Sequence, residues 1–323
     1  MNPGVADLNR HRYNGTSDND DVFRAYRRWA GAPMAIATVI STWGSAPRPR
    51  GSHMLVHVDG RSAGSVSGGC VENDVHVAAA EAIASDSTAM RRYGVTDGSA
   101  WEVGLSCGGS IEILIQPVAA TAFSPGLFDA IDNSRAAGQP IAVYTDLTTG
   151  LSTIHEKNSE NVFVNFYLPP RRLIIVGAVQ IAQALTDIAL TLGLTPIVID
   201  PRPNLLTAER FPGAIRDGRW PDEAIKSLRP NAATAVVTLS HDTKIDDPAL
   251  IAALAAPTGY VAALGSRRSH AARLERLRGA GVEPSALARI EGPAGIDLHA
   301  NGAAEIALSI AAGMVRALSQ QMP

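Results

Sequence analysis

The chain has 323 residues, 46% of them hydrophobic, and this length exceeds what one hydrophobic core usually organises, so we expect two domains. A formal net charge of -3 provides no basic surface for a phosphate backbone, and we therefore expect no nucleic-acid partner. The two cysteines are too few for a disulfide framework.

The polar N-terminal stretch and the interrupted apolar stretches predict a soluble protein. Residues 9–21 contain no apolar region before a cleavage site, so no secretory signal is expected. The most apolar stretches, residues 249–265 and 303–318, are broken by proline or charged residues and fall short of a membrane span. We expect a cytoplasmic location, where thiols remain reduced, and no membrane partner.

The first half of the chain combines helical and strand patterns in a mixed α/β domain over residues 21–167. Residues 1–20 are polar and are predicted to form a disordered tail. Asp59-Gly60 has the composition of a hairpin turn. The other expected elements are a helix from Asp20 or Asp21 to about residue 30, strands over 34–43, 54–58, 110–117, 141–145 and 162–166, and helices from residue 72 and near residue 126.

Both cysteines lie beside a pair of glycines, in Gly68-Gly69-Cys70 and in Cys107-Gly108-Gly109. Glycine lets the backbone approach a ligand closely and adopts positive φ without steric cost, so a bulky group can reach either thiol. Cys70 falls at a predicted strand-to-helix turn, where a thiolate gains from the helix dipole, although Glu72 works against that gain. Cys107 leads into a predicted strand.

The second half of the chain predicts a Rossmann-like domain over residues 171–323, after a proline-rich linker at residues 168–170. Continuous apolar strands that alternate with helices are typical of a parallel sheet covered on both faces. The expected strands are 173–176, 196–200, 235–239 and 260–264.

The first strand of this domain leads into a dinucleotide-binding motif that is only partly kept. Gly177 and Ala182 occupy the first and sixth positions, and Asp200 stands where an acidic residue holds ribose hydroxyls. The third position is Val179, whose branched side chain would crowd a pyrophosphate. The motif indicates a retained fold with weakened or changed nucleotide binding, or ordinary NAD binding, or simply a strand-ending aspartate.

Two polar clusters follow later strands, at the edge where such sheets bind ligands. They are Ser240-His241-Asp242 and Gly265-Ser266-Arg267-Arg268. Arginines, a hydroxyl and helix N–H groups suit phosphate or carboxylate. The alternatives are a helix cap at Ser266 with solvated arginines, and a hydrogen-bonded loop histidine at His241.

Several blocks, in this order along the chain, resemble the xanthine dehydrogenase accessory (XdhC/CoxI) family. They are Gly44-Ser45-Ala46-Pro47-Arg48, residues 64–72, Cys107-Gly108-Gly109, Ser240-His241-Asp242, Leu264-Gly265-Ser266-Arg267-Arg268 and Ala303-Ala304-Glu305-Ile306-Ala307. The resemblance implies a family-specific α/β domain followed by a Rossmann-type domain. The chain departs from the family pattern at three positions, Val179, Gln180 and His299.

The resemblance implies a chaperone that binds the molybdenum cofactor, assists its sulfuration and delivers it to a molybdenum hydroxylase apo-enzyme. A cofactor sulfurase and a second copy of the chain are further expected partners. Soft metal centres favour thiolate ligands, so Cys70 and Cys107 are the predicted metal ligands. The predicted cofactor-binding residues are Ser45, Arg48, Gly68, Gly69, Cys70, Glu72, Cys107, Gly108, Gly109, Gly177, Asp200, His241, Ser266, Arg267 and Arg268.

Two other functions compete with this interpretation. One is an NAD(P)-dependent oxidoreductase that uses the Rossmann domain, with His241 or a cysteine in acid–base chemistry. The other is a redox or sulfur-transfer enzyme in which Cys70 cycles through a persulfide or a disulfide with Cys107. Whether the cofactor carries a nucleotide stays open at this point.

Overall fold

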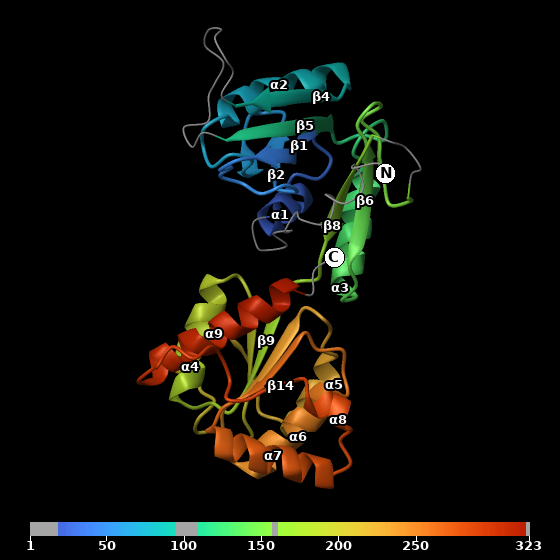
Figure 1. The fold of residues 1–323 in the computed structure, drawn as a ribbon. Helices are drawn as coiled ribbons and strands as arrows, with labels where there is room; N and C mark the ends of the chain where they lie inside the picture. Colours follow the sequence, from blue (N-terminus) through green and yellow to red (C-terminus); the bar gives the residue numbers. More distant parts are fainter. Residues whose placement is uncertain (1–18, 95–108, 157–160, 321–323) are drawn as a thin grey trace, which may run out of the picture. The chain divides into compact units, whose positions relative to one another are not determined.

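A computed structural model describes residues 19–94, 109–156 and 161–320, and the chain divides into two compact units, 1–169 and 170–323 (Figure 1). Residues 1–18 of the predicted disordered tail lie outside the described residues, whereas its last residue, Asp20, begins a helix. Asn19, just after them, is buried: its amide donates to Gly51 O at 3.1 Å and its Oδ1 accepts from His53 N at 3.1 Å. In the described residues no helix has both the length and the apolar character to cross a bilayer.

The N-terminal unit contains a five-stranded antiparallel sheet, in the order β3-β2-β1-β5-β4, and a three-stranded antiparallel sheet, in the order β7-β6-β8. The strands expected from the sequence are present, whereas β4 and β7 were not anticipated. The elements are α1 Asp20–Arg28, β1 Met34–Trp43, β2 His53–His57, β3 Ser62–Gly64, α2 Glu72–Ser85, β4 Ala89–Tyr93, β5 Ser110–Pro117, α3 Pro125–Ala136, β6 Ile141–Asp146, β7 Ser152–Thr153 and β8 Val162–Tyr167.

Strand β1 is buried on both faces of its sheet because its side chains alternate between two hydrophobic clusters. Ala35, Ala37 and Val39 pack with the apolar side of α2. Met34 and Ile36 pack with aromatic residues of α1 and α3 on the other face. A strand with two buried faces reads as a continuous apolar run, which is why the sequence identified it readily.

The C-terminal unit is a six-stranded parallel sheet in the order β11-β10-β9-β12-β13-β14. Numbered along this unit the order is 3-2-1-4-5-6, the Rossmann arrangement, and the predicted fold is confirmed. Helices α4 and α9 cover one face, and α5, α6 and α7 cover the other (Figure 1). The elements are β9 Arg172–Val176, α4 Gln180–Thr191, β10 Thr195–Ile199, β11 Ile215–Asp217, α5 Pro221–Leu228, β12 Thr234–Thr238, α6 Thr243–Leu254, β13 Tyr260–Ala263, α7 Arg267–Gly279, α8 Pro284–Leu287, β14 Ile290–Glu291 and α9 Ala303–Gln320.

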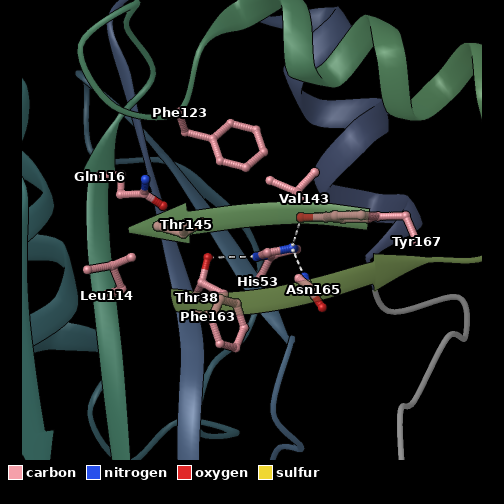
Figure 2. A pocket seen from close by; sticks show the side chains of 10 residues that line it. All are labelled: Thr38, His53, Leu114, Gln116, Phe123, Val143, Thr145, Phe163, Asn165 and Tyr167. Atoms are coloured by element: carbon pink, nitrogen blue, oxygen red, sulfur yellow. Dashed lines mark hydrogen bonds between the residues drawn. The ribbon is translucent and has the colours of Figure 1, made fainter. Parts of the chain in front are cut away.

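A buried histidine joins the two sheets of the N-terminal unit (Figure 2). His53 Nδ1 lies 2.9 Å from Thr38 Oγ1, and Nε2 lies 2.8 Å from the Tyr167 hydroxyl and 3.1 Å from the Asn165 amide nitrogen. Because an amide nitrogen can only donate, Nε2 accepts from Asn165, and the proton of the neutral ring belongs on Nδ1. Burial disfavours the charged ring and lowers the pKa of His53 to about 3.

The pKa of His53 makes the stability of the N-terminal unit depend on pH. Between its ordinary pKa of 6.5 and about 3, the unfolded chain binds a proton that the folded chain does not, so stability falls as pH falls. We expect the free energy of unfolding to drop by about 2 kcal/mol between pH 7 and pH 5. Urea denaturation, read by hydrogen exchange of peptides from β2 and β8, measures this drop.

The His53→Gln variant should lose most of this pH dependence, whereas His155→Gln, at an exposed position, should keep it. Glu72 does not interfere in this window, because its pKa change lies between 4.5 and about 2. Equal slopes in wild type and His53→Gln would show that the ring is not the titrating group.

Candidate cofactor-binding site

Cys70 lies on an exposed loop that runs from the end of β3 to the start of α2. Gly68 has φ of 78° and Gly69 has φ of 119°, conformations that side chains with a Cβ atom rarely adopt. Among the described residues, a Cβ built on Gly69 would meet nothing within 4 Å, and one on Gly68 would meet only Pro47, at 4.0 Å. The positive φ of the turn therefore requires the two glycines, and no described residue fills the space beside them.

The carboxylate of Glu72 holds this loop together. Its Oε1 accepts from the Ser65 hydroxyl at 2.7 Å and from Ser67 N at 3.0 Å. Its Oε2 accepts from Gly69 N at 2.9 Å, from Val71 N at 3.2 Å and from the Ser67 hydroxyl. Burial opposes ionisation, but the bonds from Ser67 and Ser65 outweigh it and lower the pKa of Glu72 to about 2.

These five bonds use the acceptor capacity of one carboxylate, which has about four lone-pair sites. The sequence placed Glu72 among the cofactor-binding residues, but the structure shows its oxygens already engaged by its own loop. Glu72 therefore shapes the loop that presents Cys70, rather than offering a vacant acceptor to a ligand.

The proline- and glycine-rich loop over residues 44–51 lies against the Cys70 loop. Arg48 is half-buried and its Nε donates to Ser65 O at 3.3 Å. Gly109 packs on the start of the same loop, because a Cβ there would lie 2.7 Å from Trp43 O and 2.6 Å from Ser45 O. Gly109 is thus needed for close packing of β5 against β1, and not to leave room for a ligand as the sequence suggested.

The structure therefore brings together most residues of the predicted N-terminal site. Members from three segments, residues 44–48, 64–72 and 109, meet through the contacts above. Cys107 and Gly108 lie outside the described residues, so a disulfide between Cys70 and Cys107 stays a prediction. Arg50, from the same proline-rich loop, donates to Ile40 O at 3.0 Å, and its guanidinium lies 4.7 Å from the Phe163 ring centroid.

In the C-terminal unit, Asp200 is buried and is engaged within its own unit. Its Oδ2 accepts from Ala178 N at 2.7 Å and its Oδ1 from Arg202 N at 2.9 Å. The Arg202 side chain also donates to both oxygens, at 2.9 and 2.7 Å. Burial opposes ionisation of Asp200, but these bonds outweigh it and lower its pKa. The carboxylate predicted to hold a ribose thus fixes the glycine turn instead.

Gly177 joins the first strand of the sheet to the polar cluster after β12. It has φ of 102°, and a Cβ there would lie 2.8 Å from Ser240 N. Ser240 in turn donates to Asp246 Oδ1 at 2.6 Å. His241, between Ser240 and the α6 cap Asp242, is exposed and has φ of 61°. Val179 caps α4 in an extended conformation.

The second polar cluster lies at the start of α7. Ser266 caps this helix by accepting from Ser269 N at 3.1 Å, and Arg267 and Arg268 are exposed in its first turn. Asp297 lies near this end of the helix: its pKa is lowered by the backbone and side chain of His299 and, further, by the charge of Arg267. His299 itself is 94% exposed, as expected for a surface histidine.

Comparison with known proteins identifies the family. Residues 173–314 match the family described as XdhC Rossmann domain, and residues 28–94 match the XdhC and CoxI family. A protein named molybdenum cofactor insertion chaperone PaoD, from Escherichia coli (strain K12), is 30% identical over 292 residues, which cover 88% of this chain and 83% of that protein. The chain belongs to the XdhC and CoxI family.

Two further proteins are similar to this chain along most of their length. A protein from Bacillus subtilis (strain 168), named as a probable subunit of xanthine dehydrogenase, is 26% identical, with 87% of this chain and 92% of that protein covered. A crystal structure described as a xanthine dehydrogenase from Bacillus halodurans superposes with a TM-score of 0.75 at 25% identity, covering 95% of this chain and 97% of that one. These likenesses confirm the predicted family and fold.

The sequence analysis did not identify three residues that shape the two sites: Ser65, Ser67 and Arg202. Ser65 and Ser67 lie between Gly64 and Gly68, seven and five residues before Glu72, a spacing that allows a turn to close on one carboxylate. Arg202 follows Asp200 by two residues, and such a pair reads as an ion pair only when the aspartate is known to be buried.

We expect Glu72→Gln to loosen the Cys70 loop. A glutamine would place an NH2 group against N–H and O–H donors, so two or more bonds to a charged acceptor would be lost. Amide hydrogen exchange of residues 67–71 should accelerate by about ten- to a hundredfold. The matched control is Glu81→Gln on the same helix, whose exposed carboxylate pairs with Arg91. Unchanged exchange in Glu72→Gln would contradict this role of the carboxylate.

Proposed function

We propose that this chain is a chaperone that binds the molybdenum cofactor, assists its sulfuration and inserts it into a molybdenum hydroxylase. The observation that carries the proposal is Cys70, which is exposed beside a turn of two positive-φ glycines whose open side is filled by no described residue. The family relationship adds weight, because a relative at 30% identity is named a molybdenum cofactor insertion chaperone.

The chemistry of the Cys70 loop suits a soft metal centre attached to a wide, flat ligand. Thiolates are preferred ligands of soft metal centres, and the glycines leave the sulfur accessible. Trp43, which ends β1 beside the same loops, is 73% exposed and offers an aromatic surface near Gly109. Because Glu72 fixes the loop before any ligand arrives, little ordering entropy is lost on binding.

In this proposal the remaining predicted residues hold the phosphorylated part of the cofactor. Ser45 and Arg48 lie on the neighbouring loop and would contact its phosphate, and Cys107, with Gly108, would supply a second thiolate. The C-terminal residues His241, Ser266, Arg267 and Arg268 would bind a phosphate or nucleotide portion. An exposed thiolate also suits handover, since a ligand at the surface can be exchanged for a ligand of the receiving enzyme.

The proposed partners follow from this role. The receiving enzyme would be a molybdenum hydroxylase apo-enzyme of the xanthine dehydrogenase type, because two similar proteins carry xanthine dehydrogenase in their names. A cofactor sulfurase would act on the bound cofactor, and two copies of the chain would form a homodimer. We place this activity in the cytoplasm.

An oxidoreductase that uses NAD(P) is less well supported. The carboxylate that would hold the ribose is buried and bound to Arg202 and to Ala178 N. Freeing it would expose a buried charge and break four hydrogen bonds. We therefore expect NAD(H) and NADP(H) to bind no tighter than about 1 mM by calorimetric titration. Micromolar binding of either dinucleotide would revive the oxidoreductase function.

The central test of the proposal is Cys70→Ser. Wild-type protein purified anaerobically from molybdenum-replete cells, or mixed with isolated cofactor, should carry molybdenum and pterin in near-equal amounts by native mass spectrometry. Cys70→Ser should lose most of both, by about tenfold or more, because the metal–thiolate bond is removed.

Cys107→Ser is the companion variant and should lose less, because its thiol is proposed as a second ligand. Ser41→Ala, at an exposed position of β1, leaves both cysteines intact and should retain full loading. No cofactor on the wild type by either route, or full loading of Cys70→Ser, would overturn the proposal.

A further inference from the structure

The first turn of α7 carries positive charge that nothing in the same turn balances. This helix has 13 residues and no acidic residue in its first turn, where Arg267 and Arg268 add their charges to the positive end of the helix dipole. Ser266 accepts from Ser269 N, and the helix continues from His270 N, which bonds Ser266 O at 2.9 Å. Within the described residues, no acceptor bonds the N–H of Arg267 or Arg268.

Directly behind this turn lies a buried arginine with unused donors. Arg273 is 4% exposed, and its Nη2 donates to Leu264 O at 2.7 Å. Its Nε and Nη1 have no hydrogen-bond partner among the described residues. A buried guanidinium is normally fully bonded, since each N–H removed from water without a new acceptor is destabilising.

Gly265 packs closely against α7 beside this arginine. Gly265, between β13 and the α7 cap, has φ of 140°, and a Cβ there would lie 2.5 Å from Ser269 Oγ and 3.6 Å from Arg273 Nη2. Ser269 and Arg273 are four residues apart on α7, and the Ser269 hydroxyl donates to Ser266 O at 2.9 Å. The Ser269 hydroxyl and the Arg273 guanidinium therefore both lie at the turn at Gly265.

A second unpartnered atom lies on the same face of the sheet. Thr238 ends β12 next to Ala263 of β13, and its buried Oγ1 has no partner in the described part of the chain. Its neighbour two residues back, Val236, packs in the cluster that also contains Leu277 of α7. By the two-residue alternation of a strand, Thr238 points to the α7 side.

Asp246 on α6 attracts Arg273 electrostatically but does not satisfy it. Asp246 Oδ1 accepts from the Ser240 hydroxyl at 2.6 Å and from Ser240 N at 3.3 Å. Within the described residues, no ion pair of 4.0 Å or less joins Asp246 to Arg273. The buried Nε and Nη1 donors of Arg273 therefore have no acceptor among the described residues.

We propose that the α7 N-terminus, Gly265, Ser269 and Arg273 form a phosphate-binding site of the C-terminal unit. The donors of this turn and the charges of Arg267 and Arg268, which exceed the charge of the nearby Asp297, select an oxyanion, and a tetrahedral phosphate can accept from several directions at once. In an intact dinucleotide motif the first glycine turn binds the phosphates. In this chain Ala178 N of that turn donates to Asp200, and Gly177 packs against Ser240, so we assign phosphate binding to the α7 site instead.

The inference extends the proposed function, since the phosphate could belong either to the pterin itself or to a nucleotide attached to it. Calorimetric titration of the full chain, without molybdenum cofactor, separates these sources by using inorganic phosphate, pyrophosphate and cytidine and guanosine monophosphates as probes. We expect at least one probe to bind with a Kd below about 1 mM. A nucleotide about tenfold tighter than pyrophosphate indicates a nucleotide-bearing ligand, and equal affinities indicate a bare phosphate.

Arg273→Gln should weaken the tightest probe by about ten- to a hundredfold, the usual loss for bonds to a charged donor. Because Arg273 is buried, the double variant Arg267→Ala/Arg268→Ala and the variant Ser269→Ala provide a test at exposed positions; each should weaken binding by about three- to tenfold. Arg278→Ala is the matched control, since this exposed arginine lies near the other end of α7 and pairs with Glu275.

The outcomes separate this inference from the proposed function. Cys70→Ser should bind the phosphate probes like the wild type, whereas it loses molybdenum if the chaperone function holds. No probe binding below millimolar, or equal weakening by Arg278→Ala and by the α7 N-terminal variants, overturns the phosphate site and leaves the thiol site standing.

Discussion

The geometry around Cys70 depends on the Glu72 carboxylate, which gathers donors from four residues of one loop. Backbone N–H groups of a turn with two positive-φ glycines cannot bond to each other, so an external acceptor has to satisfy them. Because the acceptor is charged, each bond is stronger than a neutral one, and together they lower the pKa of Glu72 to about 2. These bonds hold the loop in one conformation, although no described residue packs against the open side of its glycines.

In the C-terminal unit a carboxylate also fixes a glycine turn, but there it occupies the place of a ligand. Asp200 accepts from Ala178 N and from Arg202, and this closes the turn at Gly177. In a dinucleotide-binding domain the equivalent carboxylate stays available to a ribose. Here its burial and its arginine partner remove that option while they keep the parallel sheet and its strand order intact. The fold of a nucleotide-binding domain is thus retained, but its usual site is filled by the protein itself.

The fold was largely readable from the sequence, because strands buried on two faces produce continuous apolar runs, as in β1 and β9. Four strands were not predicted, for physical reasons. Strand β4 lies at a sheet edge and carries two arginines, and β7, β11 and β14 are sheet-edge strands of only two or three residues. The sequence also located the residues around Cys70. It could not assign their roles, since Glu72, Asp200 and Gly109 have residue types that suit a ligand site, and only their burial and contacts show them shaping the backbone.

Satisfied and unsatisfied polar groups divide the residues of the two candidate sites into two kinds. Glu72 and Asp200 have their acceptor capacity filled, so their contribution is to fix the loops that carry other groups. Arg273 is buried as Asp200 is, yet two of its nitrogens lack acceptors among the described residues, and a folded chain keeps such a cost only where something is gained from it. Of these groups, the residue Cys70 is exposed, whereas the unbonded donors of Arg273 are buried and lack acceptors among the described residues. A chaperone needs loops that require no ordering together with a ligand-binding group that stays accessible in the folded chain, and the Cys70 loop combines the two.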